Sequence, residues 1–188
     1  MRKLLSAGFQ RLWKDRYFWW MLAFVGIFSL ANILNSARSC IAMAEQGYIH
    51  TLDDYYFNQA PIMGGIFGLF VSVFLGTEYG DGVIRNKLVI GHKREHIYIG
   101  HFLVCCAASL LLSAVWLLVE GVGFFLIGPM EMGMADFFVY VVMTCSITVS
   151  FTAVYTLLGS LFSNKAMAVV YTIFCVFLLA IASSGFYD

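Results

Sequence analysis

Histidines near the middle of the chain and one carboxylate in an apolar run are the side chains best suited to chemistry. His92, His96 and His101 lie four and five residues apart, a spacing that could serve a metal ion. No carboxylate or thiol stands at ligand spacing beside them, so we predict no metal site and solvated histidines. Glu120 is an intramembrane carboxylate, by default a functional candidate. It lies about 35 Å along a helix from Ile97, and this depth favours an interfacial residue.

Motifs for other chemistries are absent from the sequence. No G-x-x-x-x-G-K-[ST] phosphate-binding loop occurs, so nucleotide hydrolysis must come from another chain. No E-E-x-x-x-R, G-x-S-G or H-E-x-x-H pattern supports intramembrane proteolysis. The five cysteines have neither C-x-x-C nor ligand spacing, so we expect neither disulfides nor a metal site. An enzyme using Glu120 and the histidines is therefore the weakest functional interpretation.

Composition points to a membrane protein built from helices. The chain is 61% hydrophobic and 12% charged, against about 45–50% and about 25% in soluble domains. Two prolines and uninterrupted apolar runs favour helices, which satisfy their own backbone hydrogen bonds in lipid, over barrel strands. The prediction is an all-α integral membrane protein, a polytopic helical bundle forming one domain over residues 1–188. Its zero net charge indicates no nucleic-acid partner.

Five apolar runs predict transmembrane helices. They lie at about 17–34, 61–76, 97–127, 137–162 and 166–184. Tyr17, Trp19 and Trp20 open the first run as an aromatic belt at headgroup level. The third run exceeds the ~20 residues needed to cross a bilayer, so we expect it to tilt, protrude or bend near Gly121 and Gly123.

The first 16 residues predict an amphipathic helix lying in the membrane interface. A basic polar face opposes an apolar face of five residues, Leu4, Leu5, Phe9, Leu12 and Trp13. The alternative, the basic start of a signal peptide, is disfavoured because the pattern is long and the following apolar run exceeds about 15 residues.

Basic residues are concentrated in every other segment that connects the predicted spans. With the N-terminus inside, the inner segments hold every Lys and Arg except Arg38. The positive-inside rule therefore predicts the orientation of a multi-pass protein, which we expect in a bacterial cell membrane. Its N-terminus and residues 76–100 would be cytoplasmic, and residues 35–60 would form an external loop.

One predicted span carries a ridge of small residues. Gly64, Gly68, Ser72 and Gly76 recur at every fourth position. Such ridges let helix backbones approach closely in lipid. The ridge predicts a packing face, either against another helix of this chain or against a second subunit.

The polar stretch between the second and third spans predicts a short amphipathic helix. Asp81 can cap its start, and Gly91 can end it. Val83, Ile84, Leu88 and Val89 form its apolar face, with Arg85, Asn86 and Lys87 on another. Such a helix can fill a groove on a partner protein. The alternative is a helix resting on lipid headgroups.

Residues 78–103, E-Y-G-D-G-V-I-R-N-K-L-V-I-G-H-K-R-E-H-I-Y-I-G-H-F-L, resemble the segment between the second and third spans of ABC type-2 permeases. That resemblance implies a coupling helix that docks on a cytoplasmic ATPase subunit. It assigns ATPase coupling to Asp81, Val83, Ile84, Arg85, Asn86, Lys87, Leu88 and His92. The family usually has six spans, whereas five are predicted here.

The expected function is that of a membrane-spanning permease subunit of an ABC exporter. It would form the translocation path as a homodimer or heterodimer. ATP and Mg²⁺ would bind the separate ATPase, and this chain would bind no cofactor. The uninterrupted apolar spans suit a hydrophobic or amphipathic cargo such as a peptide, lipid or drug-like molecule. The alternative is a non-transporting scaffold subunit that tethers a cytoplasmic partner.

Overall fold

The computed structural model describes residues 2–45, 60–80, 82–91, 93–127, 134–161 and 165–184, and these ranges are almost entirely helical, without strands. Long apolar runs explain the helices, because a helix pairs its own backbone groups; Pro61 lies in the first turn of its helix, where proline is tolerated. In chain order the helices are α1 (Arg2–Lys14), α2 (Arg16–Glu45), α4 (Ala60–Gly80), α5 (Val83–Val89), α6 (Arg94–Ile127), α7 (Met134–Leu161) and α8 (Lys165–Ser184).

Four helices are long and apolar enough to cross a membrane: α2, α4, α6 and α7. In the described part of α8 the apolar stretch is shorter, Val169–Leu178, whereas a crossing needs about 20 residues. The structure thus agrees with the predicted all-α membrane fold. It contains four candidate spans in its described ranges where five were predicted.

One boundary prediction is corrected by the structure. Helix α2 continues to Glu45, whereas residues 35–60 were predicted as an external loop; residues 46–59 lie outside the described ranges. The helix continues because no Gly or Pro interrupts residues 27–45. Helix α6 passes unbroken through Gly121 and Gly123. A Cβ at Gly123 would lie 2.5 Å from Ile33 Cδ1, so this glycine permits close contact with α2.

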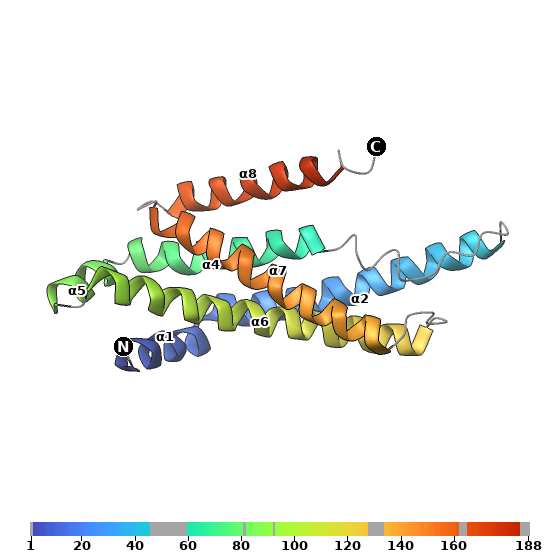
Figure 1. The fold of residues 1–188 in the computed structure, drawn as a ribbon, viewed down its shortest axis with the longest axis horizontal. Helices are drawn as coiled ribbons and strands as arrows, with labels where there is room; N and C mark the ends of the chain where they lie inside the picture. The colour runs from blue at the N-terminus through green and yellow to red at the C-terminus, as the bar shows by residue number, and fades with distance from the viewer. Residues whose placement is uncertain are drawn as a thin grey trace.

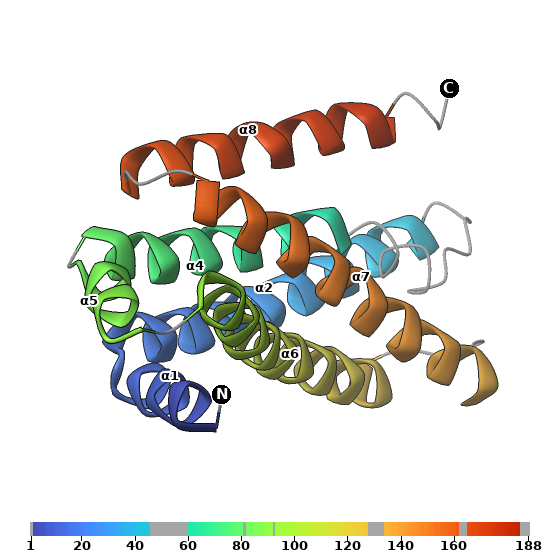
Figure 2. The ribbon, with the colours of Figure 1, turned by 60° about the vertical axis from the view of Figure 1, so that its left-hand side comes forward.

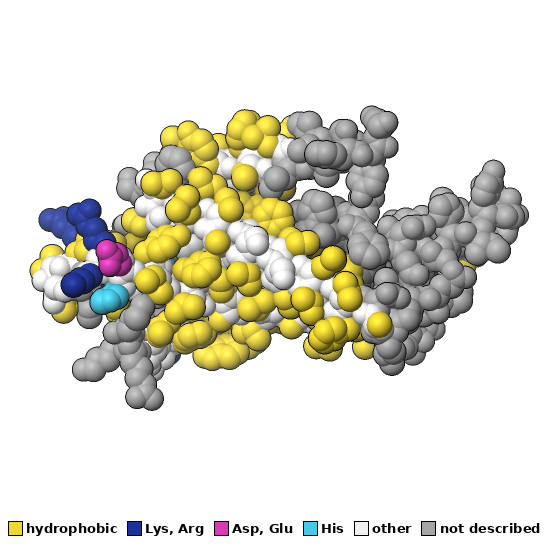
Figure 3. All heavy atoms as spheres, in the orientation of Figure 1, with side chains coloured by type: hydrophobic (Ala, Val, Ile, Leu, Met, Phe, Trp, Pro, Cys, Tyr) yellow, Lys and Arg dark blue, Asp and Glu magenta, His cyan; other side chains and the backbone are white. Residues whose placement is uncertain are grey.

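The long helices lie roughly lengthwise in one bundle (Figures 1 and 2). Helix α4 packs against α7 and α8, α6 packs against α2 and α7, and α1 lies along α6. Helix α5, the end of α4 and the start of α6 meet at one end, where α8 also begins (Figure 1). We call this the charged end, because Lys and Arg side chains gather there with Glu and His (Figure 3).

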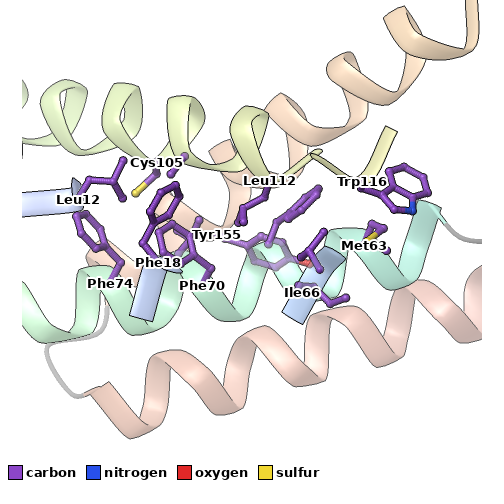
Figure 4. Packing of buried hydrophobic residues seen from close by; sticks show 14 of the residues in the cluster. Leu12, Phe18, Met63, Ile66, Phe70, Phe74, Cys105, Leu112, Trp116 and Tyr155 are labelled. Atoms are coloured by element: carbon purple, nitrogen blue, oxygen red, sulfur yellow. The ribbon is translucent and has the colours of Figure 1, made fainter. Parts of the chain in front are cut away.

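The core runs along the middle of the bundle (Figure 4). Phe18 of α2 lies between helices, with its ring 5.9 Å from that of Phe70 in α4. Leu12 of α1 is buried in the same cluster, whereas Trp13 is exposed. The predicted amphipathic helix therefore forms, and its apolar face is divided between the core and the surface.

The small-residue ridge packs within this chain. A Cβ at Gly64 would lie 2.8 Å from Phe151 of α7, and one at Gly68 would lie 2.6 Å from Tyr155. Ser72 is hydrogen-bonded to Thr172 of α8. Gly76, the fourth member, is also buried, its neighbour Leu75 lying against Gly159 of α7. Of the two possibilities left open by the sequence, the structure shows packing within the chain.

Helix α7 turns a row of hydroxyl groups into the bundle. Thr144, Thr148, Thr152 and Thr156 recur at every fourth residue and are all buried. The last three donate to the carbonyl four residues earlier, over 2.6–2.8 Å. This bonding satisfies each donor inside the helix, so the row can be buried without polar partners on other helices.

Candidate functional site

Four side chains from four helices meet at the charged end, and we call them the Glu78 cluster: Arg11 of α1, Glu78 of α4, Lys87 of α5 and His101 of α6. Glu78 Oε1 lies 3.0 Å from Arg11 Nη1, and Glu78 Oε2 lies 3.0 Å from Lys87 Nζ. His101 Nε2 contacts the same Oε2. A single carboxylate therefore joins α1, α4, α5 and α6.

The surroundings of Glu78 explain why it needs cations. Its side chain is 2% exposed, and an anion removed from water is stable only when charges or donors replace the lost water. It also stands in the last turn of α4, where the helix dipole is negative. Arg11 and Lys87 supply the compensating charge from helices on either side.

Arg11 fixes α1 against the end of α4. Its Nη2 donates to Thr77 Oγ1 over 2.8 Å, and Thr77 in turn donates to the Phe74 carbonyl. The guanidinium carbon lies 5.5 Å from the centre of the Phe74 ring, a cation–π contact. The sequence indicated only a solvated polar face for this residue.

Lys87 connects the short helix α5 to the two long helices beside it. Its Nζ lies 3.0 Å from Glu78 of α4 and 3.2 Å from His101 Nε2 of α6. Helix α5 begins after Gly82 and ends before Gly91, both with positive φ. The predicted end at Gly91 is confirmed. Gly82 holds the N-cap position predicted for Asp81, which lies outside the described residues.

The apolar residues of α5 do not share one environment. Ile84 and Leu88 line a cavity toward α4, α6 and α7, and Val83 is half-buried. Val89 is 80% exposed, and the following Ile90 is 76% exposed. Hence only part of the predicted apolar face is available to a partner.

The polar residues of α5 are divided in the same way. Arg85 and Asn86 are exposed, whereas Lys87 is partly buried in the Glu78 cluster. His92, the last residue assigned to coupling from the sequence, lies outside the described ranges. The surface that α5 offers outward, together with its C-cap residue Ile90, therefore consists of Arg85, Asn86, Val89 and Ile90.

The histidines are separated by their surroundings. His96 is exposed, as predicted, but His101 is buried in the Glu78 cluster and is not solvated. Within the described ranges no three His, Cys, Asp or Glu side chains come close enough to share a metal ion. The pattern that could have revealed His101 is Glu78 at the end of an apolar run, because a buried carboxylate there needs nearby donors.

Glu120 lies inside the bundle, far from the Glu78 cluster. It is buried, and its carboxyl group interacts with the indole of Trp116, one turn earlier in α6. Tyr140 of α7 is its aromatic neighbour on the next helix. At 1.5 Å per residue it stands about 28 Å along α6 from His101. Glu120 and this histidine therefore cannot act on one small substrate.

Comparison with known proteins gives no match from which a function could be inferred. No protein family, characterised protein or solved structure matches the chain. The Glu78 cluster and the helix attached to it are thus the features on which a functional proposal must rest.

Replacing Lys87 by Met is expected to loosen α5 while leaving the long helices packed. The change removes the only α5 side chain bonded to Glu78 in the described structure. Loss of a hydrogen bond to a charged group costs about 1.5–3 kcal/mol, so amide exchange over residues 83–89 should accelerate at least tenfold. Hydrogen exchange read by mass spectrometry checks this. Asn86→Ala, which alters an exposed side chain, is the control and should change exchange little.

Proposed function

We propose that this chain is the membrane-spanning permease subunit of an ABC exporter, coupled through α5 to a separate ATPase subunit. The observation that carries the proposal is the double attachment of Lys87, which bonds to α4 through Glu78 and contacts α6 through His101. A force applied to α5 would reach both candidate spans directly. The resemblance of residues 78–103 to ABC type-2 permeases supports the same role.

The outward face of α5 suits docking on a protein. It offers one cation, Arg85, beside the apolar residues Val89 and Ile90. An amphipathic helix with exposed apolar residues commonly fills a groove on a partner. A connecting loop of the same length would need neither the helix nor its attachment through Lys87.

The remaining parts of the proposal follow from the distribution of charge. The ion pairs of the described residues all involve Glu78 at the charged end, and none lies midway along the described long helices. This arrangement favours a hydrophobic or amphipathic cargo over a small ion. In this proposal the charged end faces the cytoplasm of a bacterial cell, and two permease chains pair above two ATPase subunits that bind ATP and Mg²⁺.

The test compares the substitution of an arginine on α5 with that of an arginine on α2. Arg85→Ala should lower the amount of ATPase that co-purifies in mild detergent several-fold, because it removes a charge from the proposed docking face. Arg38→Ala is the matched control, since Arg38 is exposed in the later part of α2 and should leave co-purification unchanged. Val89→Asp should weaken binding as well.

The readout also separates transport from tethering. If an ATPase binds and its turnover changes when α5 is loosened by Lys87→Met, the chain acts as a coupled permease. If the ATPase binds but its turnover is unchanged by Lys87→Met, the scaffold alternative is favoured. Failure to recover any ATPase from the native membrane would contradict the permease proposal.

A further inference from the structure

A cavity of about 330 Å³ opens at the charged end between α4, α5, α6 and α7. This volume lies at the lower end of the range for small-molecule sites. One side is apolar, formed by Leu75 of α4 together with Ile84 and Leu88 of α5. The cavity adjoins the candidate spans of α4 and α6, so an apolar chain could enter it from the membrane.

The lining of the cavity also contains polar side chains and one cation. Arg94, Tyr98 and His101 of α6 line it. No carboxylate pairs with Arg94 among the residues that the structure describes, whereas the charge of Glu78 is already balanced by Arg11 and Lys87. The polar part of the lining therefore presents a cation available to an anionic ligand.

We propose that this cavity binds one anionic phospholipid, with its phosphate at Arg94 and the first part of an acyl chain against Leu75, Ile84 and Leu88. Basic pockets between membrane helices recognise anionic headgroups, and each basic residue contributes about fivefold in affinity at such a surface, or about 1 kcal/mol. A purely apolar ligand would leave Arg94 without a counter-charge, and a free phosphate would leave the apolar wall empty. The site goes beyond the proposed transport function and does not depend on it.

The test counts bound lipids by native mass spectrometry of the purified chain in a neutral detergent. Phosphatidylglycerol should bind at least fivefold more tightly than phosphatidylcholine with the same acyl chains. Arg94→Gln should weaken the binding of phosphatidylglycerol about fivefold, whereas Lys93→Gln should leave it unchanged. Lys93 is the matched control because it is adjacent, exposed and outside the cavity lining.

A second pair of variants tests the volume of the cavity instead of its charge. Ser160→Met of α7 places a longer side chain into the cavity, while the Ser160 carbonyl that accepts from Tyr79 over 3.1 Å is retained. Binding should fall at least fivefold. Ser150→Met is the control, since Ser150 is exposed on the same helix and, like Ser160, donates to the carbonyl of an earlier residue of that helix.

Three results would overturn the site. They are equal binding of the two lipids, equal losses in Arg94→Gln and Lys93→Gln, and unchanged binding in Ser160→Met. Binding of glycerol phosphate as tight as that of phosphatidylglycerol would also count against it, because the apolar wall would then contribute nothing. None of these measurements involves an ATPase, so failure here is distinguishable from failure of the proposed function.

Discussion

Replacing Glu78 by Gln is expected to destabilise the purified protein more than any other single substitution in the Glu78 cluster. The change leaves Arg11 and Lys87 facing each other without the carboxylate that separates them. Removing one partner of a buried ion pair costs about 3–5 kcal/mol. The measurement is a thermal melt in mild detergent, followed by hydrogen exchange over α1 and α5, which should both lose protection.

Two comparisons make this result specific to the cluster. Glu95→Gln removes an exposed carboxylate from the first turn of α6, and its effect should stay within about 1 kcal/mol. Adding Lys87→Met to Glu78→Gln should restore part of the stability, because the second change removes a cation that has lost its partner. If Glu78→Gln melted at the same temperature as the wild type, the carboxylate would not be what holds these helices together.

The second large effect is expected at Gly68, where a single added methyl group should disturb the contact of α4 with α7 and α8. A Cβ at this position would lie 2.6 Å from Tyr155 Cε2 and 2.8 Å from Thr172 Cγ2. Both neighbours are buried, so they cannot move aside freely. Overpacking of this kind costs about 1–3 kcal/mol, and the melting temperature of Gly68→Ala in detergent should fall accordingly.

Gly26 provides the matched control. It lies inside α2, and a Cβ there would have no heavy atom within 4 Å. Alanine is better than glycine in a helix interior by about 0.5–1 kcal/mol, so Gly26→Ala should be neutral or stabilising. We therefore predict that alanine lowers the melting temperature at Gly68 and leaves it unchanged or raises it at Gly26. A fall in dimer content without loss of monomer stability in Gly68→Ala would instead indicate that the ridge packs between subunits.

The Glu78 cluster also explains how a helix of seven residues can keep a defined position. Helices this short are unstable alone, because nucleation is costly and few backbone bonds form. Helix α5 is stabilised by Lys87 and by the contact of Ile84 and Leu88 with the cavity wall. In the proposed permease these same contacts would carry motion from a docked ATPase into α4 and α6.

Much of the fold was predictable because it follows from local properties of the chain. Hydropathy marked each long helix to within a few residues at most ends, and Gly91 marked the end of α5. The exception, the continuation of α2 to Glu45, also has a local cause. Polar residues were read as a loop, although a helix that emerges into water can remain helical when neither Gly nor Pro interrupts it.

The orientation of helix faces required the tertiary structure. In a soluble helix the polar side indicates which residues face outward, but lipid is as apolar as a core, so a membrane helix gives no such indication. The partner of the Gly64–Gly76 ridge and the burial of Glu120 therefore could not be predicted. The Glu78 cluster could not be predicted from the sequence for a related reason. The side chains that contact Glu78 come from residues 11, 87 and 101, and only the packing of α1, α5 and α6 around α4 brings them to one carboxylate.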